Sequence, residues 1–161
     1  MSRVLVLLTA ISVTGVFAST SVAEPEQAVS LLLHKATGER WERDIHFQCE
    51  VALDNALGRD LGVRSAFFSV FDGLQIVVTT PTGKVLAQQG YTFHQSPFAP
   101  LGRVFPLQKG ETVGTLVFPI NGLPNEIRSV KVRLVGTLPG SGYDRMLSSE
   151  TLAVEVKPRR P

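Results

Sequence analysis

The chain has 161 residues, of which 43% are hydrophobic and 19% are charged. Its 16 basic and 14 acidic residues nearly balance, and the basic residues are scattered rather than gathered into a stripe. Because nucleic-acid binding relies on clustered contacts to phosphates, this pattern argues against a nucleic acid as partner. The length suits a single domain that is large enough to build its own core.

The first residues have the features of a secretory signal peptide. Arg3 supplies a positive charge, the apolar run VLVLLTAISVTGVFA follows it, and Ser21 and Ala23 place small residues before Glu24. The run is shorter than the ~20 apolar residues that a membrane-spanning helix needs. A charged start, a short apolar run and a small-residue cleavage site together are typical of an export signal.

We therefore expect residues 1–23 to be a signal peptide and residues 24–161 to form one domain without a transmembrane segment. The protein would be secreted or periplasmic, in a bacterium. Cleavage after Ala18 and an uncleaved membrane anchor are the alternatives. The single cysteine, Cys49, excludes an internal disulfide, so packing must stabilise the exported domain.

The rest of the chain alternates between apolar and polar residues in short stretches. Apolar residues recur at every second position in three segments, and these residues are predicted to face the core: Ile45, Phe47, Cys49 and Val51; Leu74, Ile76 and Val78; Val130, Val132 and Leu134. This alternation is typical of half-buried strands. The segment TLAVEVK near the end of the chain has the same pattern, with Leu152, Val154 and Val156 facing inward.

Turn residues separate these segments at short intervals. We expect turns at Thr37–Gly38, Asp72–Gly73, Pro81–Gly83 and Asn121–Gly122, because proline and glycine supply the backbone angles that turns require. No segment has a convincing helical period. The pattern predicts an all-β fold, namely an antiparallel β-sandwich of about seven or eight strands, immunoglobulin-like or C2-like.

One short segment, FPLQKGET, resembles the Leu-x-x-Gly-Glu start of a strand in bacterial immunoglobulin-like modules. The resemblance covers eight residues and implies no function.

The stretch YTFHQSPFAPLGRVFPLQKGE contains three prolines, which remove ladder donors, so we expect a long loop from Gln95 to Lys109. Loops of this length are either packed on themselves or functional. In the structural interpretation its phenylalanines plug one end of the sandwich. In the functional one, Tyr91, His94, Phe98 and Arg103 form a recognition surface, because aromatic residues and arginine are enriched in binding hot spots.

A second glycine-rich stretch, GTLPGSGYDRML, lacks the Gly-Lys-Ser/Thr ending and the following helix of a phosphate-binding loop. The simple interpretation is a hairpin connection. If it is functional, Tyr143, Asp144 and Arg145 form a polar and aromatic loop tip that contacts a partner.

A metal site is a weaker hypothesis. His46 and Glu50 share one face of a strand, and His94 is a possible third ligand from elsewhere in the chain. We find no catalytic motif, since both the Gly-x-Ser-x-Gly and the His-Glu-x-x-His patterns are absent. We therefore expect no enzyme activity and no cofactor.

These observations favour an exported, non-catalytic binding module that is monomeric or weakly oligomeric. Its partner would be a protein or another component of the cell envelope. The binding loops would be Ala56–Ser65, Gln95–Lys109 and Pro139–Arg145, at one end of the sandwich. A small-ligand or metal-binding domain centred on His46, Glu50 and His94 is the alternative.

Overall fold

The computed structural model describes residues 29–65, 69–91 and 103–158, and every regular element in these ranges is a β-strand. The all-β prediction is therefore confirmed, and no helix of the described chain is suited to crossing a membrane. The predicted signal peptide, His94 and Phe98 lie outside the described residues. The strands are β1 (Val29–Trp41), β2 (Asp44–Asn55), β3 (Leu61–Ser65), β4 (Leu74–Thr79), β5 (Val85–Gly90), β6 (Arg103–Leu107), β7 (Gly110–Asn121), β8 (Ser129–Leu138), β9 (Tyr143–Ser148) and β10 (Leu152–Pro158).

Eight of these strands form one curled sheet in the order β5-β4-β8-β10-β1-β2-β7, with β9 beside β8, and β3 and β6 form a separate pair. All neighbours are antiparallel except β1 and β10, where Gly38 lies opposite Val156 in a parallel register. The expectation of a purely antiparallel arrangement is wrong at this pair. A parallel pair needs a long crossover connection. Here almost the whole chain separates β1 from β10, so no local sequence pattern predicts the pairing.

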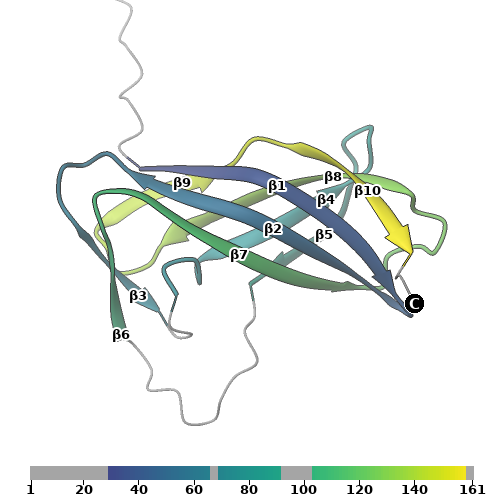
Figure 1. The fold of residues 1–161 in the computed structure, drawn as a ribbon, viewed down its shortest axis with the longest axis horizontal. Coiled ribbons are helices and arrows are strands. Elements are labelled where there is room, and N and C mark those ends of the chain that lie inside the picture. Colours follow the sequence, from purple (N-terminus) through teal and green to yellow (C-terminus); the bar gives the residue numbers. More distant parts are fainter. Residues whose placement is uncertain (1–28, 66–68, 92–102, 159–161) are drawn as a thin grey trace, which may run out of the picture.

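Strand β10 links the two arms of the curled sheet. Its first residues pair with β8, and its last residues pair with β1. In Figure 1, β1, β2 and β7 lie in front of β4, β5 and β8. Buried residues from both arms make one hydrophobic core. The fully buried members with the largest side chains include Phe47, Phe118, Ile45, Leu53, Leu74, Ile76, Ile120 and Leu134.

The inward faces predicted from alternation are confirmed with one partial exception. Val130, Val132 and Leu134 are buried on β8, whereas Lys131 and Arg133 between them are exposed. The predicted core residues of β2 and β4 are buried in the same way. Leu152 is only half-buried, although it packs against the core.

The turn predicted at Thr37–Gly38 is wrong, because β1 continues through it to Trp41. Gly38 lies opposite Phe47 on β2. A Cβ atom at Gly38 would lie 3.1 Å from the ring of Phe47 and 3.4 Å from Val154. The glycine therefore makes room for a core phenylalanine inside a strand rather than ending the strand.

All three segments predicted as loops contain strand residues. Leu61–Ser65 is β3, inside the expected loop Ala56–Ser65, and Arg103–Leu107 is β6, inside the expected loop Gln95–Lys109. In the third, Pro139–Arg145, the expected loop tip of Tyr143, Asp144 and Arg145 is instead the start of β9. Pro106 sits in β6 opposite Gly62. A two-stranded sheet has only edge strands, and an edge strand tolerates a proline whose missing donor would face away from its partner.

Candidate functional site

The three segments predicted as binding loops meet at one end of the molecule, which we call the loop end: Ala56–Ser65, Arg103–Lys109 and Pro139–Arg145. The backbone nitrogen of Arg64 donates to the carbonyl oxygen of Pro139 at 2.6 Å. Ser65 pairs with Arg103. The backbone nitrogen of Lys109 donates to Asp60 at 3.0 Å. These contacts join the segments into one continuous surface.

A buried asparagine anchors the loop end to the sheet. Asn55 is the last residue of β2 and has no exposed surface. Its Nδ2 donates to the carbonyl oxygens of Arg59 at 2.9 Å, of Leu107 at 3.2 Å and of Gln108 at 3.3 Å. Its Oδ1 accepts from the backbone nitrogen of Leu57 at 3.2 Å. One side chain therefore fixes the segment after β2 against the β6–β7 turn.

The two tyrosines predicted to contact a partner are half-buried and pack inward. The ring of Tyr91 meets that of Phe118 edge-on, with 5.7 Å between the centroids. Burial, and secondly the nearby charge of Asp72, raise the pKa of Tyr91 above its usual value. The hydroxyl of Tyr143 donates to the carbonyl oxygen of Val29 at 3.4 Å. Both rings therefore contribute to packing in the domain more than to a surface that a partner could contact.

The charged residues predicted for the site are exposed, as a binding role requires. Arg103 begins β6, and Asp144 and Arg145 lie on β9. Within the described part of the loop end, five basic side chains and two acidic ones are exposed, namely Arg59, Arg64, Arg103, Lys109 and Arg145 against Asp60 and Asp144. The loop end thus has a net positive charge on a nearly neutral protein.

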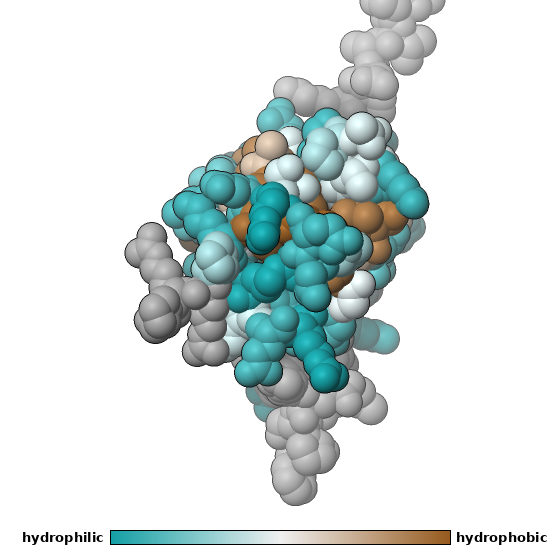
Figure 2. Space-filling view, turned by 90° about the vertical axis from the view of Figure 1, so that its right-hand side faces the viewer, coloured by the Kyte–Doolittle hydropathy of each residue, from teal (hydrophilic) through white to brown (hydrophobic). Residues whose placement is uncertain are grey.

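The opposite end of the β1–β2 hairpin carries a second candidate, of which the sequence analysis named only His46. Figure 2 looks onto this end and shows mostly hydrophilic residues with small hydrophobic areas among them. The rings of Trp41 and His46 stack there, with centroids 4.6 Å apart and an interplanar angle of 3°. Both residues line two adjoining hollows, with volumes of about 380 and 330 Å³.

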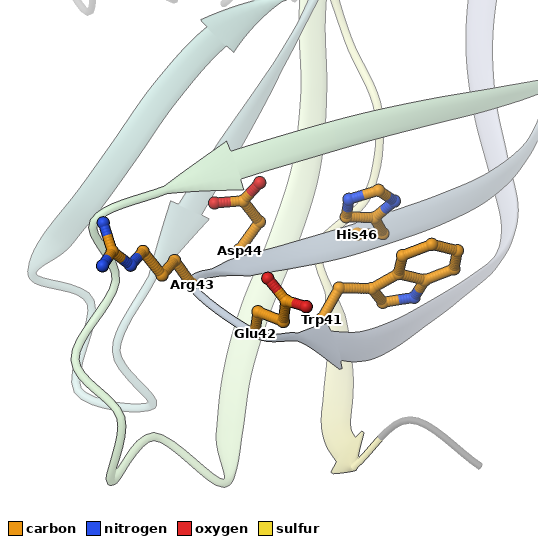
Figure 3. Close-up of a pocket in the computed structure, with 5 residues that line it drawn as sticks. All are labelled: Trp41, Glu42, Arg43, Asp44 and His46. Atoms are coloured by element: carbon orange, nitrogen blue, oxygen red, sulfur yellow. The ribbon is translucent and has the colours of Figure 1, made fainter. Parts of the chain in front are cut away.

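We call the larger of the two the hairpin hollow; Trp41, Glu42, Arg43, Asp44 and His46 line it (Figure 3). Its turn has an unusual backbone, because Glu42 has a φ of 40°, a left-handed conformation that favours glycine. The turn residues are Glu42 and Arg43, so no glycine or asparagine in the sequence indicates a turn here. The only tryptophan of the chain, set among charged residues, was the signal that could have located the site.

Hydrogen bonds fix the polar groups around the ring pair. The indole nitrogen of Trp41 donates to Oε2 of Glu39 at 3.2 Å. The amide group of Asn121, oriented with its nitrogen toward Asp44, donates to the carboxylate at 3.0 Å to Oδ2. Asp44 and Asn121 are also cross-strand neighbours on β2 and β7. The rings and the carboxylate therefore have defined positions.

His46 and Glu50, the two described residues of the metal hypothesis, do not converge, and His94 lies outside the described residues. His46 stacks on Trp41, whereas Glu50 pairs with Lys35 at 3.1 Å. Four residues of extended strand place His46 and Glu50 ~13 Å apart, too far to share an ion. His34, the other described histidine, has its Nε2 3.1 Å from Oε1 of Glu111. In the ranges that the structure describes, no three His, Cys, Asp or Glu side chains gather to hold a metal ion.

No protein-family model matches the chain, and no curated protein matches it.

Proposed function

We propose that the protein is an exported, non-catalytic binding module with an immunoglobulin-like β-sandwich fold. The connectivity supports this fold: β1, β2 and β7 form one arm, β5, β4, β8 and β10 form the other, and the parallel pair of β1 and β10 joins them. A C2-like arrangement is the alternative. The apolar segment before Glu24 supports export.

The proposed partner is an anionic component of the cell envelope, either a protein or another polymer. The observation that carries the proposal is the charge of the loop end, where five exposed basic residues face solvent with only two acidic ones. Charge complementarity speeds encounter with a partner and suppresses wrong ones. A recognition surface on loops fixed by a rigid sheet is also the usual arrangement in sandwich proteins.

The chemistry of the one thiol supports a non-catalytic role. Cys49 is fully buried on β2. Burial raises the pKa of its thiol to about 12, so the reactive thiolate does not form at neutral pH. Together with the absence of catalytic motifs, this leaves binding as the favoured function.

The test compares two matched triple variants for binding to isolated cell envelopes. Arg64→Glu, Arg103→Glu and Arg145→Glu reverse charge at the loop end. The control, Arg128→Glu, Lys131→Glu and Arg133→Glu, reverses the same number of exposed charges before and on β8. We expect the loop-end variant to lose most of its sedimentation with envelopes and the control to keep it. Equal recovery of the two variants would contradict the proposal.

A second candidate is small-ligand binding. The observation that favours it is the hairpin hollow, where a stacked aromatic pair and fixed polar groups line a shallow concave site. It does not involve the loop end, so the two proposals can fail separately.

A further inference from the structure

The hairpin hollow contains an aromatic wall beside carboxylates. Trp41 is 36% exposed, which leaves part of the indole accessible beside the imidazole of His46. Trp41 and Asp44 are directly opposite each other at the end of the β1–β2 ladder, and the two-residue turn closes it. Because the sheet holds both strands, the wall is preorganised rather than assembled on binding.

The charges around the wall favour a cation. Figure 3 shows the carboxylates of Glu42 and Asp44 beside the ring pair, whereas the guanidinium of Arg43 points away from it. Two further basic residues lie on the neighbouring strands. Arg40 donates to the carbonyl oxygens of Pro124 and Ile127, both at 3.2 Å, and Lys157, opposite Glu39 in the β1–β10 pair, does not line the hollow. The ligand side of the hollow is therefore acidic, in contrast to the basic loop end.

The bond between Trp41 and Glu39 strengthens this preference. A carboxylate that accepts the indole N–H at 3.2 Å pushes electron density into the ring system. The face of tryptophan already attracts cations better than that of any other side chain, and a richer ring attracts them more. An aromatic face with flanking carboxylates is the chemistry that recognises alkylammonium groups.

We propose that the hairpin hollow is a binding site for a compact organic cation, namely an alkylammonium group held against Trp41 and neutralised by Glu42 and Asp44. The site lies at the opposite end of the β1–β2 hairpin from the loop end and does not depend on the function proposed there. The neighbouring hollow, which Glu39 and Gln48 also line, gives the rest of a larger ligand room to extend toward β7.

The test uses tetramethylammonium as the probe and the fluorescence of Trp41 as the readout, because the chain has one tryptophan. Sodium chloride at equal concentration controls for ionic strength. Neopentyl alcohol, which is similar in size and branching but uncharged, controls for apolar contact, and methyl glucoside tests a saccharide. We expect a saturable change with tetramethylammonium alone. A linear response to all four, or saturation by either neutral probe, overturns the proposal.

Matched variants locate the binding. Glu42→Gln removes a charge beside the rings, and we expect it to weaken tetramethylammonium binding by at least ~3-fold. Glu50→Gln removes an equal charge from β2, on the face that carries His46 but far from the hollow. It should change the affinity for tetramethylammonium by less than ~2-fold. Trp41→Phe, followed by saturation-transfer NMR of the probe, should weaken binding by at least ~5-fold. If Glu42→Gln and Glu50→Gln weaken tetramethylammonium binding equally, the proposed site is wrong. Thermal melts verify that each variant is folded.

Discussion

The amide nitrogen of Asn55 lies 3.2 Å from the carbonyl oxygen of Leu107, a contact between the end of β2 and the end of β6. The side chain has no exposed surface, so water does not compete for its hydrogen bonds. It therefore couples the sheet to the loop end, and the shape of the proposed binding surface depends on it.

The first prediction concerns this anchor. Asn55→Leu removes the buried donor that the carbonyl oxygens of Arg59, Leu107 and Gln108 share, so we expect a loss of about 2–4 kcal/mol in the free energy of unfolding. Asn125→Ala, at an exposed position, should cost under about 0.5 kcal/mol. Urea unfolding followed by circular dichroism measures both. Similar midpoints for the two variants would show that Asn55 is not an anchor.

The second prediction tests the inward and outward faces of β8. Val132 has no exposed surface, so Val132→Asp places a charge without a partner in the core and should unfold the domain. Lys131→Asp changes the neighbouring exposed residue and should shift the melting temperature by only a few degrees. A thermal melt distinguishes the two, and comparable losses would contradict the assignment of faces.

The third prediction concerns close backbone contact between β8 and the segment before β4. A Cβ atom at Gly136 would lie 2.3 Å from the carbonyl oxygen of Gly73, a backbone atom that moves only if the segment before β4 shifts. We expect Gly136→Ala to cost at least about 2 kcal/mol of stability. Gly90→Ala is the matched control, because a Cβ there meets nothing within 4 Å. It should be neutral or stabilise by up to about 1 kcal/mol.

The fourth prediction is a pH dependence that Cys49 causes. Burial raises the pKa of the thiol from its ordinary 9.0 to about 12 in the folded protein. The unfolded chain then releases the proton first, so stability is fully present below pH 9 and is lost as the pH rises toward 12. Cys49→Ala should flatten this part of the curve of unfolding free energy against pH. Parallel curves for the two proteins would contradict the prediction.

Sequence patterns predicted the parts of the fold that local chemistry determines. The inward residues of β2, β4 and β8 follow from period-two alternation, and the turn at Pro81–Gly83 follows from its proline and glycine, with Gly83 at a φ of 97°. Both features depend on a few residues that are close in the sequence, so a local sequence pattern predicts them.

The features that depend on distant residues could not be predicted. Gly38 was predicted as a turn residue because the sequence does not show that the ring of Phe47 packs against it. Pro106 was predicted to interrupt a strand because the sequence does not show that β6 pairs only with β3. The stack of Trp41 on His46 requires the register of the hairpin, and its turn at Glu42 has no residue that favours positive φ.

The candidate site was predicted in part for the same reason. The sequence analysis predicts that the three loop segments lie close together, and their described parts do meet. Their role in binding stays a prediction. The inward orientation of Tyr91 and Tyr143 depends on packing against Phe118 and near Val29, which the sequence does not show.

Export is the fifth prediction. The protein isolated from the secreted or periplasmic fraction should begin at Glu24, as N-terminal sequencing determines. Protein that retains Met1 and fractionates with membranes would instead support an uncleaved anchor.

Hydrogen exchange of the processed protein, with and without envelope material, tests the central claim most directly. Binding through the loop end should slow exchange in residues 56–65, 103–109 and 139–145 and leave residues 41–48 of the hairpin unchanged. The protection should weaken as salt is raised, because the proposed contacts are ionic. Protection confined to other strands, or no protection at all, would contradict the account.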